Sequence, residues 1–276
     1  MRDTFGGIKV EEVITIAREA GEKILDIYRR QELFVEHKED SSPLTLADKL
    51  SHDFIESRLK ALYPNIPIVS EEDVVPYEVR QNWNVFWLID PLDGTREFIM
   101  RNEEFTINIA LIEDGAPVVG VIGVPIYRDI YYALKDRGAF KIAGDGRRKR
   151  IRISDETPKD KIIVAVSRSH RTEELEEYVE GLKKLYNRVE YILVGSSLKF
   201  CLIAEGKAHV YPRLGPTMGW DTAAGQLIAE EAGVMVIDAH TRRRLSYNKV
   251  ELVNGPFIAG SNFFFNNMIM RRKSET

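Results

Sequence analysis

The chain has 276 residues, enough for one large domain or two closely packed ones. Hydrophobic residues make up 44% and charged residues 30%, a balance that is typical of globular proteins and excludes a disordered chain. The formal net charge of −4 excludes a protein-wide basic surface for nucleic acid. A single cysteine, Cys201, excludes an internal disulfide framework and a multi-cysteine metal site.

No stretch approaches the roughly 18 consecutive apolar residues of a membrane-spanning helix, and the N-terminal region lacks the features of a signal peptide. We therefore expect a cytoplasmic protein without an integral membrane segment; peripheral attachment at the inner face of the membrane remains an alternative. The basic run at 147–150 is short and flanked by Asp145 and Asp155. We interpret it as a solvated hairpin and expect no nucleic-acid partner.

The first half of the chain begins with two helical patterns. Apolar residues recur three or four positions apart over residues 8–30 and over residues 46–62, and Pro43 and Pro64 flank the second segment. Apolar stretches separated by turn residues then predict strands at 85–89, 105–112, 117–124, 130–134 and 138–142. The short connections between these strands predict an antiparallel sheet.

From about residue 160, strand and helix patterns alternate. We expect strands at 162–167, 191–194, 208–212, 233–237 and 256–260, and helices at 172–186, 196–205 and 221–232. This alternation predicts α/β layers. We therefore divide the chain into an α+β half, residues 1–150, and an α/β half, residues 151–276, which meet in the polar stretch 144–160.

Two aspartates follow the apolar strand pattern at 85–89. Asp90 and Asp93 are three residues apart, with the Leu92 carbonyl between them, so they can point into one site. Hard divalent cations such as Mg²⁺ take oxygen ligands, and paired ions can clamp the attacking water and the leaving oxygen of an in-line displacement. Gly94 and Thr95 come next, and their backbone N–H groups can hold a phosphate. The alternative interpretation of this stretch is a tight turn.

Three further acidic residues lie where predicted elements begin or end. Asp48 fits a capping box with Thr45, Glu71 fits a solvated loop, and Asp221 fits a helix N-cap. Each structural interpretation is the commoner one when the residue is taken alone. The occurrence of all of them in one chain favours a metal-dependent phosphoryl-transfer site.

Two motifs together resemble the paired signatures of the inositol monophosphatase-like superfamily: WLIDPLDGTREF at 87–98 and GWDTAAGQLIAEEAG at 219–233. The resemblance extends from about residue 8 to residue 262. It implies a Mg²⁺-dependent, lithium-sensitive phosphatase with a layered α-β-α-β-α sandwich. Within the superfamily, three stretches resemble the bacterial 3′(2′),5′-bisphosphate nucleotidases: GTREFIMRNEEFTINIALI, SRSH at 167–170, and GSSLKFCLIAEGKAHVYPRLGPTMGWDTAAG at 195–225.

Carried over residue by residue, the resemblance implies three groups of site residues. The metal ligands for two or three Mg²⁺ ions would be Glu71, Asp90, the Leu92 carbonyl, Asp93 and Asp221. Asp48 and Thr95 would orient and deprotonate the attacking water. The substrate-binding group would be the backbone N–H groups of Gly94 and Thr95 and the side chains of Ser169, His170, Ser196, Lys199 and Arg213. For Lys199 and Arg213, which lie in apolar segments, the alternative interpretation is a side chain that reaches past apolar neighbours to water.

The reaction that we expect is hydrolysis of adenosine 3′,5′-bisphosphate to AMP and phosphate. The nearer alternative is a phosphatase for inositol or sugar monophosphates with the same metal core, and the more distant one is a non-catalytic binding module. The expected partner is a small phosphorylated nucleotide, and the chain would act as a monomer or a homodimer. For the loop at 72–84, a mobile cover over the site and a surface connection remain open alternatives.

Overall fold

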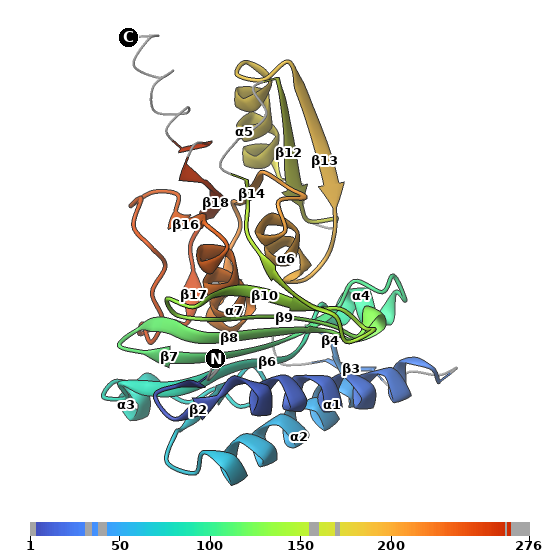
Figure 1. Cartoon of the computed structure of the whole chain (residues 1–276), viewed down its shortest axis with the longest axis vertical. Helices are drawn as coiled ribbons and strands as arrows, with labels where there is room; N and C mark the ends of the chain where they lie inside the picture. The colour runs from blue at the N-terminus through green and yellow to red at the C-terminus, as the bar shows by residue number, and fades with distance from the viewer. Residues whose placement is uncertain are drawn as a thin grey trace.

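The computed structural model describes residues 4–30, 35–37, 43–154, 160–168, 172–262 and 264–265. Its elements stack as five layers in the order helix, sheet, helix, sheet, helix (Figure 1). The outer layers are α1 (Val10–Tyr28) with α2 (Leu46–Leu62) at one face, and α5 (Glu173–Lys183) at the other. This is the layered architecture that the resemblance implied.

The first sheet has seven strands in the spatial order β11-β10-β9-β8-β7-β6-β5. In chain order they are β5 (Ile68–Ser70), β6 (Val85–Asp93), β7 (Thr106–Glu113), β8 (Ala116–Val124), β9 (Asp129–Leu134), β10 (Gly138–Ile142) and β11 (Arg148–Ile151). All neighbours are antiparallel except β5 and β6, which run parallel. The five predicted strands and their antiparallel pairing are confirmed, whereas β5 and β11 were not predicted.

Helices α1 and α2 cover one face of this sheet because each carries an apolar stripe at helical spacing. Ile14, Ile24 and Ile55 are fully buried in the same cluster as Val119 and Val121 of β8. The helix predicted over 8–30 begins two residues later, since 8–9 form the short strand β2, and it ends at 28. The predicted helix 46–62 is confirmed at both ends.

The middle layer consists of α6 (Leu198–Ala204) and α7 (Gly219–Glu231), which lie between the two sheets (Figure 1). From position 219 to position 229 of α7, every residue except Asp221 is buried, as expected for a helix covered on both sides. The approach to the first sheet is close: a Cβ on Gly120 of β8 would lie 2.8 Å from the Ala224 carbonyl oxygen. The chain passes from the first sheet to the second after β11, yet α7 packs on both sheets.

The second sheet has the spatial order β13-β12-β14-β18-β16. Its strands are β12 (Lys161–Val166), β13 (Arg188–Leu193), β14 (Val210–Arg213), β16 (Val234–Asp238) and β18 (Phe257–Ser261). β12 is parallel to β13 and β14, whereas β18 is antiparallel to β14 and β16. Leu175, Val179 and Leu182 pack α5 against its outer face. The expected alternation of strands and helices is confirmed.

Short elements complete the described chain. They are β1 (Thr4–Phe5), β2 (Ile8–Lys9), β3 (Val35–His37), β4 (Pro43–Thr45), α3 (Tyr77–Arg80), α4 (Thr95–Ile99), the 3₁₀ turn η1 (Pro125–Tyr127), β15 (Thr217–Met218) and β17 (Val253–Asn254). Among the described residues, no helix combines the length and the apolar composition that a membrane span requires.

The basic run at 147–150 forms an exposed hairpin with β10, as predicted. Its charges have acidic neighbours: Arg147 bonds Asp145, and Arg148 bonds Glu11 of α1. Asp155, which we expected to flank this run, lies outside the described residues.

Candidate active site

The segment DPLDGT lies at the end of β6, where the strand leaves its regular pairing with β7. Asp90 faces Asn108 and Asp93 faces Thr106, so β6 has one residue more than β7 over this stretch. Such a bulge bends the strand and re-aims its side chains. We expected the strand to end at residue 89, but it continues through Asp93, so both aspartates belong to the strand end and not to a free turn.

Gly94 links this strand end to α4 and needs to be glycine for two reasons. Its φ of 92° lies in the left-handed region. A Cβ at this position would also lie 3.0 Å from the Glu104 carbonyl oxygen and 3.3 Å from the Ser196 Cβ. The backbone at 94–95 is therefore packed closely against the loop that precedes α6.

The buried Asp48 carboxylate caps α2, as one interpretation of the sequence predicted, and it also contacts Thr95. It closes the capping box of α2, accepting hydrogen bonds from the backbone N–H and the hydroxyl of Thr45. Its other oxygen accepts a hydrogen bond from the Thr95 hydroxyl at 3.0 Å. Burial raises the pKa of Asp48, so this carboxylate is a better proton acceptor than an exposed aspartate.

Asp93 joins β6 to the loop before α6. Its Oδ2 accepts a hydrogen bond from the backbone N–H of Ser197 at 2.6 Å. Ser197 is itself fixed, because its hydroxyl donates to the Asn108 side-chain oxygen at 2.7 Å. Burial raises the pKa of Asp93 to about 6 even though the positive charge of Lys199 opposes the shift. Two segments about 100 positions apart in the sequence thus meet at one carboxylate.

Three further carboxylates influence this region electrostatically. The backbone N–H of Glu71 donates to the Ile89 carbonyl at 3.2 Å, which continues the parallel pairing of β5 and β6 and brings Glu71 beside Asp90. Asp221 is the third residue of α7 and not its N-cap, as one interpretation of the sequence had it; its side chain accepts a hydrogen bond from the N–H of the N-cap residue Met218 at 2.9 Å. Burial raises the pKa values of Asp90 and Asp221 well above the usual range, and the charges of Glu71 and Asp93 raise both further.

This arrangement has the donor chemistry of a hard divalent cation: clustered, buried oxygen groups that repel one another until a cation neutralises them. Within the part of the chain that the structure describes, no three acidic, histidine or cysteine side chains are already gathered as a complete ligand cluster. Their oxygens instead accept hydrogen bonds from backbone N–H groups, as Asp90 does from Leu92 at 3.1 Å. The residues therefore fit a cation, and their assignment as ligands stays a prediction.

A hollow of about 130 Å³ opens beside Asp93, Gly94 and Asp221. The predicted binding residues Ser196, Lys199 and Arg213 all line it. Ser169 and His170, which we also predicted, lie outside the described residues.

The two cations of this hollow are held differently. Lys199 is buried, and its ammonium group donates to the carbonyls of Val194 and Ser196 at 3.2 and 2.7 Å. Burial lowers the pKa of Lys199 to about 8. Arg213 donates through one terminal nitrogen to the Pro216 carbonyl, while its buried Nε has no hydrogen-bond partner among the described residues. A buried donor without an acceptor is expected where an anionic ligand supplies one.

The hollow also contains residues that we did not predict: Glu97, Ser167, Thr217 and Thr222. Glu97 and Thr222 stand within the two signature motifs, four residues after Asp93 and one after Asp221. Their closeness to the predicted metal ligands was the signal that could have identified them as site residues. Ser167 and Thr217 lie within two of the stretches that resemble the nucleotidases, but nothing in those stretches singles them out from their neighbours.

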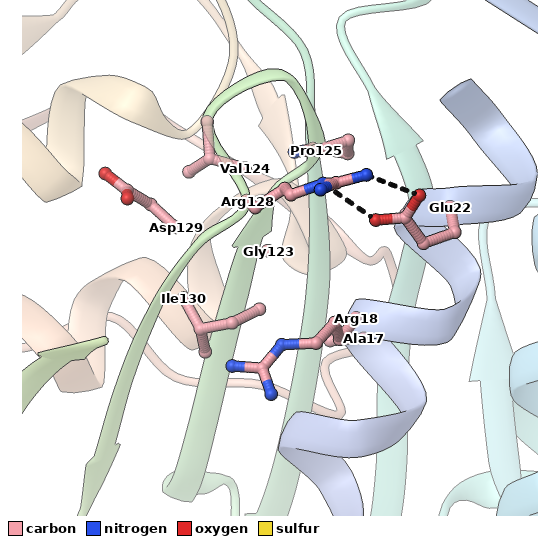
Figure 2. A pocket seen from close by; sticks show the side chains of 10 residues that line it. Ala17, Arg18, Glu22, Gly123, Val124, Pro125, Arg128, Asp129 and Ile130 are labelled. Carbon is pink, nitrogen blue, oxygen red and sulfur yellow. Dashed lines mark hydrogen bonds and ion pairs between the residues drawn. The ribbon is translucent and has the colours of Figure 1, made fainter. Parts of the chain in front are cut away.

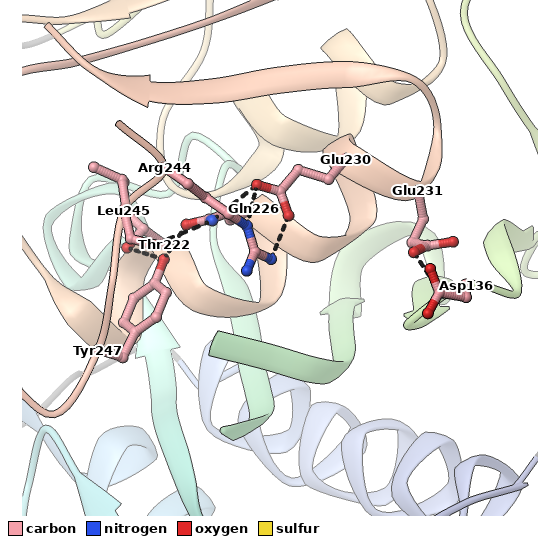
Figure 3. Close-up of polar contacts among 8 residues, drawn as sticks. All are labelled: Asp136, Thr222, Gln226, Glu230, Glu231, Arg244, Leu245 and Tyr247. Atoms are coloured by element: carbon pink, nitrogen blue, oxygen red, sulfur yellow. Dashed lines mark hydrogen bonds and ion pairs between the residues drawn. The ribbon is translucent and has the colours of Figure 1, made fainter. Parts of the chain in front are cut away.

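A buried chain of hydrogen bonds fixes α7 behind Asp221 (Figure 3). The Tyr247 hydroxyl donates to the Gln226 side-chain oxygen at 2.7 Å and contacts the Thr222 hydroxyl at 3.2 Å. Gln226 donates to Glu230, which forms an ion pair with Arg244 at the surface. α7 is thus held in place along its length by groups of the segment 244–247.

A second hollow, shown in Figure 2, lies between α1 and the turn after β8. It has space for only about 10 Å³, and its most prominent polar feature is the exposed ion pair between Glu22 and Arg128. None of the predicted site residues that the structure describes lines it. The hollow beside Asp93 is therefore the better candidate for a substrate site.

The chain is similar to known proteins over most of its length. The chain matches the model of the inositol monophosphatase family over residues 9–263. It is 48% identical to the 3′(2′),5′-bisphosphate nucleotidase CysQ of Salmonella typhimurium over 83% of this chain and 90% of that protein. The CysQ protein of Buchnera aphidicola is 41% identical over 94% of this chain and 97% of that protein.

Solved structures give the same result. The crystal structure of CysQ from Bacteroides thetaiotaomicron, a bacterial member of the inositol monophosphatase family, superimposes with a TM-score of 0.80 at 43% identity, covering 91% of this chain and 96% of that one. A Thermotoga maritima IMPase, 23% identical, shares the fold with a TM-score of 0.77 over 95% of each chain. The predicted fold and both predicted resemblances are confirmed: the chain belongs to the inositol monophosphatase family and is similar within it to the CysQ nucleotidases.

Proposed function

We propose that this protein is a divalent-metal-dependent phosphatase that removes the 3′-phosphate of adenosine 3′,5′-bisphosphate and releases AMP. The similarity to proteins named 3′(2′),5′-bisphosphate nucleotidase supports phosphatase activity on such a nucleotide. The observation that carries the finer proposal is the composition of the hollow, where the acidic residues Asp93 and Asp221 adjoin the cations Lys199 and Arg213. One end suits a metal-assisted phosphate and the other suits a second anionic group.

The acidic end would hold the cation. Its ligands would be Glu71, Asp90, the Leu92 carbonyl, Asp93 and Asp221, and Mg²⁺ is the ion that this all-oxygen set suits best. When bound, Mg²⁺ would supply charge neutralisation for the transferring phosphate and lower the pKa of water.

The proton released by the attacking water has a route through this chain's own residues. The Thr95 hydroxyl lies at the start of α4 and donates to Asp48 at 3.0 Å. Asp48 is buried with a raised pKa, so it can take up a proton that Thr95 passes on. Backbone N–H groups at Gly94 and Thr95 would hold the phosphate during this step.

The rest of the nucleotide would occupy the cationic end and an adjoining hollow. Arg213 has an unsatisfied buried N–H for the 5′-phosphate, and Lys199 lies nearby. A hollow of about 320 Å³ shares Ser167, Tyr211 and Arg213 with the first one and continues along the apolar residues Leu214 and Pro216. Such a surface suits a planar base. An inositol or sugar monophosphate would leave the Arg213 N–H without an anionic partner.

The proposal is tested by phosphate release from adenosine 3′,5′-bisphosphate by the native protein and by Asp90→Asn. Removing one buried negative charge should weaken the metal site without removing core volume, so we expect turnover to fall by at least about 100-fold. Asp26→Asn, at an exposed position of α1, is the matched control and should keep native turnover. Native activity in a folded Asp90→Asn variant would overturn the metal assignment.

A further inference from the structure

One carboxylate in the substrate hollow has no role in the proposed function. Glu97 is the third residue of α4 and lines the hollow together with Gly94, Ser196 and Lys199. A negative charge there repels a phosphorylated substrate, so an acidic side chain is unfavourable unless it binds some other group of that substrate.

The Glu97 side chain makes no hydrogen bond or ion pair with any other residue that the structure describes, although cations are close by. Arg168 instead bonds the Glu104 carboxylate at 2.5 Å and the Leu193 carbonyl at 3.2 Å. Lys199 donates to two carbonyls of the loop before α6. The charge of Glu97 acts on both cations, yet neither bonds to it. Its two oxygens remain available to a ligand.

The neighbouring loop leaves room for this side chain. A Cβ on Gly195 would lie 2.7 Å from the Glu97 Cγ and 3.1 Å from its Cδ. The Gly195 N–H donates to Glu104 at 2.8 Å, and Arg168 holds Glu104 in turn, which fixes the loop beside Glu97. Glu97 is therefore packed between α4 and a fixed loop, at a defined place in the hollow.

The place of Glu97 suggests which substrate group it meets. Side chains of a helix lean toward its N-terminus, so Glu97 leans toward Gly94 and Thr95, where the proposed function puts the scissile phosphate. A carboxylate that lacks a proton only accepts hydrogen bonds. In a nucleoside bisphosphate, the nearest hydrogen-bond donor to the 3′-phosphate is the hydroxyl on the adjacent ribose carbon.

We propose that Glu97 accepts a hydrogen bond from the ribose hydroxyl adjacent to the scissile phosphate, and that it makes the enzyme selective for ribonucleotides. The inference rests on the proposed function and identifies the sugar that the site selects. A hydrogen bond to a charged group of this kind corresponds to about 10-fold to 100-fold in selectivity.

The test compares kcat/KM for adenosine 3′,5′-bisphosphate with kcat/KM for its 2′-deoxy analogue. The native protein should prefer the ribonucleotide by at least about 10-fold. In Glu97→Ala the preference should fall to near unity through a slower reaction of the ribonucleotide alone. Glu97→Gln keeps the size and one acceptor oxygen and should show an intermediate preference. Glu103→Gln, an exposed carboxylate just after α4, is the matched control and should keep native selectivity.

The outcomes separate this inference from the proposed function. The role of Glu97 would be overturned if the native protein hydrolysed the two nucleotides at equal rates. It would also be overturned if folded Glu97→Ala and Glu97→Gln lost activity equally on both nucleotides. In either case the nucleotidase proposal would stand. Absence of phosphate release from either nucleotide by the native protein would overturn the proposed function and this inference with it.

Discussion

Removal of divalent cations should destabilise the folded protein by an amount that grows as the pH rises. Burial raises the pKa of Asp93 to about 6 from its ordinary value of 3.8. A carboxyl with a raised folded-state pKa contributes stability that is fully present below the unfolded-state value and is lost as the pH rises through the folded-state value. Asp90 and Asp221 shift in the same direction. A cation bound to the ionised groups should offset this loss.

The magnitude follows from the shift at Asp93. About two pKa units correspond to about 3 kcal/mol of unfolding free energy, of which about half is lost between pH 5 and pH 8. Because Asp90 and Asp221 add to it, the metal-free protein should lose more than this amount over the same range. Protein in excess Mg²⁺ should show a much smaller dependence.

Urea unfolding at about 25 °C, followed by tryptophan fluorescence in EDTA and in excess Mg²⁺, measures the difference. The stabilisation by Mg²⁺ should be larger at pH 8 than at pH 5. Asp93→Asn should remove its share of the pH dependence, whereas Asp26→Asn on the exposed face of α1 should leave the dependence unchanged. A Mg²⁺ effect that is the same at both pH values would show that these carboxyl groups do not have raised pKa values in the metal-free protein.

Two structural predictions concern the support of the site. Gly94→Ala should lower the free energy of unfolding by about 1–2 kcal/mol because Gly94 has a positive φ and lies close to a carbonyl oxygen. Gly181→Ala is the control: this position in α5 has open space around it, so stability should stay equal or rise slightly. Equal urea midpoints for the two variants would contradict this prediction. Tyr247→Phe should lower the free energy of unfolding by about 1–2 kcal/mol because the Gln226 side chain loses a buried hydrogen-bond donor. The control is Tyr127→Phe at an exposed position. An equal decrease in the two variants would contradict the prediction.

The sequence predicts the long elements well because their periodicity is strong. α1 carries apolar residues at helical spacing along its length, and the predicted strands of the first sheet are mainly apolar runs between turn residues. The two strands of this sheet that were not predicted, β5 and β11, lack such a pattern. β5 has only three residues, and β11 reads RKRI, so its place at the edge of the sheet depends on pairing with β10.

The site is predictable as far as its residues lie in contiguous motifs. Asp48 shows why a local pattern does not decide function, because one carboxylate caps α2 and also receives the Thr95 hydroxyl. Glu97 lies within the first signature motif, but the sequence does not show that it packs beside Gly195, which is distant in sequence. Their contact exists only in the folded chain.

The connection at 72–84 is held to the rest of the protein by a buried arginine. Arg80 donates to the Val75 carbonyl, to the Asn248 side chain and to the carbonyls of Lys249 and Val250. Four acceptors on two segments argue for an anchored surface connection over a mobile cover.

We propose that the buried carboxylates support metal-dependent hydrolysis of a bisphosphate nucleotide. The most direct test is phosphate release from adenosine 3′,5′-bisphosphate and from inositol 1-phosphate, measured side by side in Mg²⁺ and in EDTA. We predict a preference for the nucleotide of at least about 100-fold, lost in EDTA. Equal or reversed preference would contradict the nucleotide assignment, and release that persists in EDTA would contradict the metal core.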